Sequence, residues 1–117
     1  MQKGDLKFGD IAWTDFDPSI GHEFQGRRPA LIIESDIQLN KSNLVTVVPI
    51  TGNTQNNLLT DDILIFTDAC NNLRNNSVIK MYCITSFDYL RFRKKIGKIN
   101  AATSTKVKFY LRKHFDL

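Results

Sequence analysis

The sequence predicts a single, mainly β domain of the α+β class: a strongly curved, mostly antiparallel sheet or small barrel with one or two helices. Three observations support this. Short segments alternate apolar and polar residues, Asn- and Gly-rich stretches separate them, and an apolar stripe with helical spacing lies near the C-terminal end. Because 117 residues is the usual size of one domain with one core, we expect residues 1–117 to form one domain.

The predicted strands occupy most of the first hundred residues. Period-two alternation marks residues 11–16, 30–34, 44–50, 63–66, 78–84 and 96–99. Turns are expected between them, notably at GNTQNN after Thr51 and at NNLRNNS before Val78, since Asn and Ser side chains bond to nearby backbone groups. Pro49 interrupts the third segment and indicates an edge strand or a bulge, because proline cannot donate a ladder hydrogen bond.

An amphipathic helix is predicted after Asn100. Its apolar stripe follows the spacing i, i+3, i+4, i+7 and i+8 and consists of Val107, Tyr110, Leu111, His114 and Phe115. The opposite face carries Lys and Arg residues, so we expect the helix to pack on the sheet through the stripe. A short helical turn is also expected at residues 86–90.

The composition is that of a globular protein without a membrane segment. Hydrophobic residues make up 42% of the chain and charged residues 24%, and no stretch approaches the roughly 18 apolar residues that a membrane span needs. The N-terminal MQKGDLKFGD lacks the apolar region of a secretory signal, and Cys70 and Cys83 lack the spacing of metal or redox sites. We therefore expect a cytoplasmic protein with no membrane contact and no bound metal.

Positive charge is concentrated in the last quarter of the chain. Residues 91–117 hold nine of the 16 Lys and Arg residues but only one of the 12 acids. Five of the eight residues from Arg91 to Lys98 are basic. This stretch either steers a polyanion such as RNA or DNA toward the domain or forms a solvated basic turn.

Two residues at expected strand ends suggest a phosphate site. Arg28 directly precedes Pro29, where the second strand is expected to begin, and Thr51 follows the end of the third. If these ends meet, a guanidinium group and a hydroxyl converge under the glycine-flanked loop of residues 17–26. The alternative is that Arg28 pairs with a loop carboxylate at the surface and that Thr51 is an ordinary turn residue.

A family resemblance is carried by three segments: GDIAWTDFDPSIGHEFQGRRPALII, VVPIT and NSVIKMYCITSFD. In order and spacing they resemble the MazF/PemK toxins of bacterial toxin–antitoxin pairs. The resemblance implies an SH3-like barrel of the CcdB type, usually a homodimer, that cuts single-stranded RNA without a metal ion or other cofactor. It also implies an antitoxin partner whose acidic segment blocks the RNA groove.

The resemblance places the family's catalytic arginine on Arg28 and its catalytic threonine on Thr51. In such toxins the ribose 2'-hydroxyl attacks the adjacent phosphorus and leaves a 2',3'-cyclic phosphate and a free 5'-hydroxyl. Arginine suits charge stabilisation, because its planar donors bind two oxygens and it stays protonated. Thr51 is expected to donate a hydrogen bond to a phosphoryl oxygen or to the nucleophile.

Three further residues near the loop are candidates for RNA contact. Glu23 occupies the glutamate position of the family's G-x-E motif, where it either positions the loop, reads a base or accepts the 2'-hydroxyl proton. His22 is the other candidate base, since an imidazole titrates near neutral pH. Arg27 is either a phosphate contact or a solvated residue on the opposite face of the strand.

Readout of unpaired bases requires aromatic planes and polar groups at the base edges. The polar-flanked aromatic residues are Phe24, Tyr82 and Tyr89. Thr85 and Ser86 follow the fifth strand, where the resemblance implies RNA contacts. Many family members have an acid and a glutamine where this chain has Tyr82 and Cys83, so the recognised RNA sequence is expected to differ.

Two other functions remain open at this point. One is a non-enzymatic poison that binds a protein target such as DNA gyrase, since the CcdB relatives share the fold. The other is a degenerate toxin that only binds its antitoxin. The presence of both Arg28 and Thr51 favours the ribonuclease.

Overall fold

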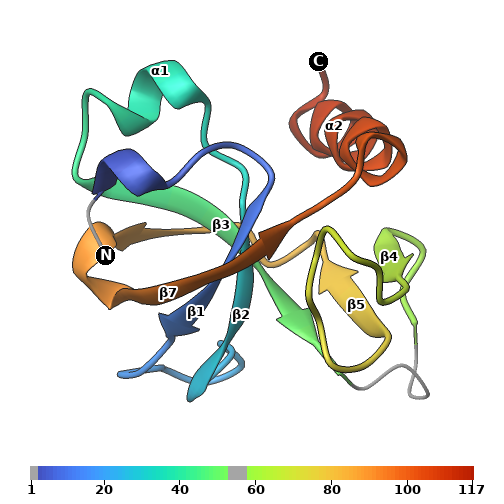
Figure 1. The fold of residues 1–117 in the computed structure, drawn as a ribbon, viewed down its shortest axis with the longest axis horizontal. Helices are drawn as coiled ribbons and strands as arrows, with labels where there is room; N and C mark the ends of the chain where they lie inside the picture. The colour runs from blue at the N-terminus through green and yellow to red at the C-terminus, as the bar shows by residue number, and fades with distance from the viewer. Residues whose placement is uncertain (1–2, 53–57) are drawn as a thin grey trace.

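The computed structural model describes residues 3–52 and 58–117, and within them seven strands form one antiparallel sheet (Figure 1). The strands are β1 (Asp10–Asp15), β2 (Arg27–Ile32), β3 (Leu44–Thr51), β4 (Asp62–Ile65), β5 (Ser77–Lys80), β6 (Thr85–Asp88) and β7 (Phe92–Lys98). The helices are the 3₁₀ turns η1 (Lys3–Asp5) and η2 (Tyr89–Arg91), the short α1 (Asp36–Leu39) and the long α2 (Ala101–Phe115). The mainly β architecture with a C-terminal helix is therefore confirmed.

The strand order is β4-β5-β3-β2-β1-β7, and β6 also pairs with β3. On one side of β3, residues 44–47 pair with β6 and the last two residues pair with β5, while residues 47–49 pair with β2 on the other side. The prediction of an edge strand at Pro49 is wrong, because β3 is an interior strand. Pro49 falls in the gap between the β6 and β5 pairings, where no neighbouring strand requires its missing N–H.

Alternation along the central strands produces two apolar clusters, one on each face of the sheet. The first cluster includes Ile11, Leu31 and Val48 and is covered by Val107 of α2. The second cluster, on the opposite face, consists of Leu6, Ala12, Phe16, Ala30, Ile32, Leu39, Val45, Val47 and Phe92, with Phe24, Phe87 and Tyr89 packed against it. The helix α2 covers only the first cluster. The second is covered in part by the loop after β1, which carries Phe24, and by the β6–η2 segment, which carries Phe87 and Tyr89.

The helix α2 begins and ends with well-formed caps. The Asn100 side chain accepts a hydrogen bond from the Thr103 backbone at 2.8 Å, and Asp116 ends the helix in the left-handed conformation. Val107 is buried, but Phe115 at the end of the predicted stripe is 54% exposed, so the helix packs through a shorter stripe than expected. No helix in the described residues is long and apolar enough to cross a membrane.

Several boundaries differ from the prediction for local reasons. The expected strand at residues 78–84 is too long: β5 ends at Lys80, because a turn follows in which Cys83 N–H bonds to the Lys80 carbonyl at 3.1 Å, and β6 begins only at Thr85. The expected turn at residues 86–90 is the end of β6 followed by η2. β2 begins at Arg27 rather than at Ala30, because Pro29 pairs with β1 in a stretch where β2 has no partner on its other side.

An ion pair lies inside the sheet between β4 and β5. Lys80 Nζ lies 2.6 Å from Asp62 Oδ2, and the two side chains are 11% and 1% exposed. The backbone N–H of Leu59 donates to the same carboxylate oxygen at 2.8 Å. Within the described parts of the chain, Asp62 Oδ1 has no hydrogen-bond partner, so this carboxylate depends on Lys80 for compensation of its buried charge.

Replacing Lys80 by methionine is expected to lower the free energy of unfolding by about 3 to 5 kcal/mol, because it leaves the Asp62 carboxylate buried without a counter-charge. Urea unfolding at pH 7 measures this. The double variant Lys80→Met, Asp62→Leu removes both charges and is expected to recover most of the loss. A single variant as stable as the unaltered chain would contradict a compensating role for Lys80.

Candidate active site

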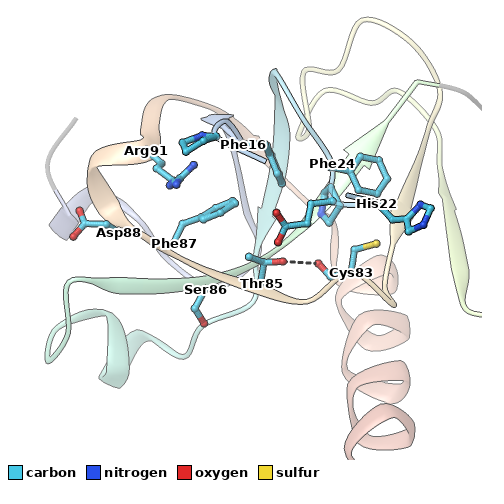
Figure 2. A pocket seen from close by; sticks show the side chains of 12 residues that line it. Phe16, His22, Phe24, Cys83, Thr85, Ser86, Phe87, Asp88 and Arg91 are labelled. Atoms are coloured by element: carbon cyan, nitrogen blue, oxygen red, sulfur yellow. Dashed lines mark hydrogen bonds between the residues drawn. The ribbon is translucent and has the colours of Figure 1, made fainter. Parts of the chain in front are cut away.

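A cavity of about 640 Å³ lies on the face of the sheet that carries the second cluster, between the loop after β1 and the β6–η2 segment (Figure 2). Its walls come from three parts of the chain that are far apart in sequence. The residues that line the cavity are Phe16, Pro18, His22, Glu23, Phe24, Pro49, Cys83, Thr85, Ser86, Phe87, Asp88 and Arg91. The pairing of β6 with β3 brings the last of these segments beside the loop.

The predicted RNA-contact residues, apart from Arg27, line this cavity. His22, Glu23 and Phe24 belong to the loop after β1, and Thr85 and Ser86 belong to β6. Figure 2 shows the Thr85 hydroxyl donating to the Cys83 carbonyl, at 3.3 Å. The Ser86 hydroxyl lies 3.0 Å from that of Thr46 on β3. The fold therefore gathers two separate predicted segments into one concave surface.

Arg28 lies beside the cavity rather than in its wall. Its Nε and Nη2 groups donate to the Gln25 carbonyl at 3.1 and 2.8 Å, and its guanidinium group lies 4.8 Å from the centre of the Phe24 ring. Partial burial lowers the pKa of Arg28, and nearby Asp17 acts in the opposite direction. The half-buried guanidinium group is thus held in one orientation by the loop, while it remains a cation at neutral pH.

The register of β2 and β3 relates Arg28 to Thr51. Ala30 is paired with Pro49 and Leu31 with Val48, and the same count two positions further on matches Arg28 with Thr51, although no pairing is formed there. Thr51 instead pairs with Val78 of β5, and it is not among the residues that line the cavity. The ladder itself stops at Ala30, because Pro29 has no N–H to donate to β3. Strand alternation puts Arg28 on the face of Ala30, and Thr51 on the face of Pro49, which lines the cavity.

Arg27 points to the other face of β2 and is not brought to the cavity. Its Nε lies 2.7 Å from Asp15 Oδ1, and Arg93 lies 2.6 Å from the other oxygen of the same carboxylate. Hydrogen bonds from these two guanidinium groups hold the pKa of Asp15 below its ordinary range. Together with Trp13 and Lys94, both arginines line a separate shallow hollow.

The basic stretch from Arg91 to Lys98 divides between several environments. Of these residues, all of which the structure describes, only Arg91 lines the cavity. Arg93 pairs with Asp15 at 2.6 Å, and Lys95 Nζ lies 3.2 Å from Asp10 Oδ2. Sequence analysis did not identify Arg91 or Phe87 as site residues. The sequence offers one weak signal for them: Phe87 is an aromatic residue four positions before Arg91, the first residue of the basic stretch.

The family model for PemK-like, MazF-like toxins of type II toxin–antitoxin systems matches residues 7–115. The chain belongs to this family. It is 32% identical to the endoribonuclease EndoA of Bacillus subtilis over an alignment of 102 residues, and this alignment covers 87% of each chain. It is 42% identical over 43 residues to the endoribonuclease toxin MazF of Escherichia coli, and this match spans only 37% of the present chain and 39% of that relative.

Solved structures of family members have the same fold. MazF from Deinococcus radiodurans aligns over 96% of this chain and 97% of its own, with a TM-score of 0.81 and 21% identity. The Mycobacterium tuberculosis toxin MazF-mt6 aligns over 92% and 97%, with a TM-score of 0.73 and 23% identity. A mycobacterial endoribonuclease in complex with its cognate antitoxin aligns over 96% and 94%, with a TM-score of 0.70 and 16% identity.

Cys83 gives this family member a thiol in the cavity wall. Burial raises the pKa of the Cys83 thiol, and this effect outweighs the opposing contributions of Tyr82 and Lys80. The other cysteine, Cys70, is exposed on the surface. Because only the thiolate is nucleophilic, the half-buried Cys83 should be the less reactive of the two.

Alkylation by iodoacetamide at pH 8 is therefore expected to modify Cys70 first and Cys83 markedly more slowly. A raised pKa leaves a smaller thiolate fraction at this pH, and the rate at Cys83 should increase as the pH rises further. Mass spectrometry of peptides from timed samples measures both rates, and the Cys70→Ser variant isolates the slower one. Equal rates in the folded protein would show that Cys83 is not shielded.

Proposed function

We propose that this chain is an endoribonuclease toxin that cleaves single-stranded RNA without a metal ion. Its family membership and the endoribonuclease names of its relatives support the class of activity. The observation that carries the proposal for this chain is the β2–β3 register. Carried two positions beyond its last pair, this register supports an assignment of Arg28 and Thr51 to the face of the sheet that bears the cavity, and Arg28 is stacked on the cavity residue Phe24.

The proposed reaction begins with attack of a ribose 2'-hydroxyl on the adjacent phosphorus. The bond from phosphorus to the 5'-oxygen breaks, and the products are a 2',3'-cyclic phosphate and a free 5'-hydroxyl. Charge on the phosphoryl oxygens is stabilised by Arg28, whose Nη1 group has no hydrogen-bond partner among the described residues. The Thr51 hydroxyl donates to a second phosphoryl oxygen. The Arg28 guanidinium group is held by the Gln25 carbonyl before substrate binds, which is the condition for a large electrostatic contribution.

Glu23 and His22 are the two candidates for accepting the 2'-hydroxyl proton. Glu23 Oε1 already accepts the backbone N–H of Ile20 at 2.6 Å, which supports a role for Glu23 in holding the loop. Its second oxygen has no partner in the described part of the chain, so the same carboxylate retains an acceptor for substrate. His22 is an exposed residue of the cavity wall, and a neutral imidazole can act as a general base. We favour Glu23, the residue that the G-x-E motif carries.

The walls of the cavity suit unpaired bases. Phe24 and Phe87 offer aromatic surfaces, and the hydroxyl groups of Thr85 and Ser86 can bond to base edges. Bases in a duplex are already stacked and cannot enter such a space, so the proposed substrate is single-stranded RNA, such as mRNA.

The Arg28→Ala and Thr51→Ala variants are each expected to lose about a hundredfold to a thousandfold in cleavage rate, because each removes one preorganised donor. Single-turnover cleavage of RNA in EDTA, with end-mapping of the products, measures rate, end chemistry and sequence preference together. Arg112→Ala and Thr105→Ala, at exposed positions of α2, are matched controls and should cleave at the unaltered rate.

Undiminished cleavage by both site variants would overturn the assignment of Arg28 and Thr51. A complete absence of RNA products from the unaltered chain, together with trapped gyrase–DNA cleavage complexes, would instead support a CcdB-like poison. Antitoxin binding with neither activity would support a degenerate toxin.

The proposed partners are a cognate antitoxin, whose acidic segment would compete with RNA, and a second copy of this chain. The antitoxin complex of a structural neighbour supports the first. Exposed apolar side chains support the second: Leu44 and Leu90, which are 53% and 68% exposed, flank the point where Tyr89 N–H bonds to the Asn43 carbonyl.

We expect the chain alone to sediment as a homodimer at micromolar concentration, because these apolar residues are otherwise left in water. Sedimentation velocity over a range of concentrations measures the mass. Substituting Leu44 and Leu90 by Ser is expected to shift the equilibrium toward monomer, whereas Leu117→Ser, which alters the still more exposed leucine at position 117, should not. A monomer at all concentrations would contradict the homodimer.

A further inference from the structure

Arg91 is fixed in the cavity wall by contacts to a distant part of the chain. Its Nη1 group donates to the backbone carbonyls of Asp15 at 3.2 Å and Asp17 at 2.8 Å. Its guanidinium group also lies 4.6 Å from the centre of the Phe87 ring, which packs edge-on against Phe16 at 5.2 Å. Figure 2 shows Arg91 and the two rings on the same side of the cavity. The guanidinium group is therefore oriented before any ligand arrives.

The charge of Arg91 is not neutralised by the protein. No carboxylate in the described residues forms an ion pair with it, whereas its neighbours Arg93 and Lys95 pair with Asp15 and Asp10. Asp88 lines the same cavity, but its Oδ1 accepts the Leu90 backbone N–H at 2.9 Å. Glu23 also lines the cavity, and it too forms no ion pair with Arg91. The Arg91 guanidinium group is thus a cation without a direct counter-ion in a concave space, where a phosphate can approach it.

The donors that remain available are the pair best suited to an oxoanion. The Nη1 group of Arg91 is occupied by the two carbonyls, whereas its Nε and Nη2 groups have no hydrogen-bond partner among the described residues. These two groups form one edge of the guanidinium plane and donate in parallel, which matches two oxygens of a phosphate. Arg28 differs in this respect, since the same edge of its guanidinium group is bound to Gln25.

We propose that Arg91 is a second phosphate-binding residue of this site. It holds the backbone phosphate of a nucleotide next to the scissile linkage through Nε and Nη2, while Arg28 acts at the scissile phosphate itself. This inference rests on the proposed function and deepens it, because it assigns a second contact to the RNA backbone. The fixed orientation of Arg91 lowers the entropy that is lost when RNA binds.

The test is equilibrium binding of a randomised single-stranded 2'-O-methyl oligoribonucleotide over a range of salt concentrations. This probe cannot be cleaved, because it lacks the attacking hydroxyl. Arg91→Gln is expected to weaken binding by about tenfold to a hundredfold. It should also reduce the slope of log K against log salt by about 0.7, the value for one single-strand phosphate contact. Arg91→Lys keeps the charge, so it should keep most of the slope while losing the bidentate geometry.

Arg112→Gln is the matched control, since it removes the same charge from the exposed surface of α2, and it should leave the slope unchanged. If Arg91 only holds the loop in place through the Asp15 and Asp17 carbonyls, both Arg91 variants should bind RNA more weakly with an unaltered salt slope. That result would overturn the inference. Urea unfolding of each variant identifies loss of fold. If Arg91→Gln fails to fold, probes of one fixed sequence with a single neutral methylphosphonate linkage decide: neutralising the linkage next to the scissile one should cost less affinity in Arg91→Lys than in the unaltered chain, and an equal cost in both proteins would overturn the inference.

The inference and the proposed function fail in different ways. Cleavage of unmodified RNA by the unaltered chain, with unchanged affinity and slope in Arg91→Gln, would overturn only the role of Arg91. Loss of slope in Arg91→Gln without cleavage of any RNA would overturn only the nuclease. A chain that does not bind the oligonucleotide at all would overturn both.

Discussion

The register between β2 and β3 determines which side chains reach the cavity face. Leu31 and Val48 are fully buried on the face that α2 covers, so the residues next to them in each strand must point to the opposite face. A slip of one residue would turn Arg27 toward the cavity and Arg28 away from it, and would expose the core at the same time. The apolar packing that stabilises the sheet therefore also determines that Arg28, and not Arg27, lies on the cavity face.

The acids of β1 have a related effect on charge. Asp15 binds Arg27 and Arg93, and Asp10 binds Lys95, so a stretch of sequence that is strongly basic is partly neutralised when β7 pairs with β1. The Arg27 and Arg93 side chains are 58% and 54% exposed, and surface pairs of this kind contribute about 0 to 1 kcal/mol each, too little to explain the stability of the sheet. Their larger consequence is electrostatic, because they neutralise part of the charge of β7. Among the described residues, Arg91 in the cavity and Lys94 and Lys98 on β7 remain without an ion pair.

The parts of the fold that sequence analysis predicted are those governed by local periodicity. β1 and β3 are largely apolar strands buried on both faces of the sheet, and α2 buries one stripe, so each leaves a clear pattern in the chain. The end of β5 was predicted four residues too late, because the turn after it is made by backbone groups of Lys80 and Cys83 whose side chains do not signal it. β6 was not predicted as a strand, because a helical turn was expected at residues 86–90. The start of β2 was missed because Pro29 is acceptable only where one side of the strand has no partner, and that depends on tertiary pairing.

The same distinction applies to the site. His22, Glu23 and Phe24 were found because they form a continuous motif, whereas Arg91 becomes a cavity residue only when its guanidinium group reaches carbonyls 74 and 76 positions earlier in the sequence. The cavity therefore requires both the β3–β6 pairing and the approach of η2 to the end of β1. A chain in which β6 and η2 have detached would retain Arg28 on β2 but lose one wall of the cavity together with Arg91. In the proposed function, substrate binding is thus coupled to completion of the fold, because the wall that carries Arg91 is assembled by the longest-range contacts of the cavity.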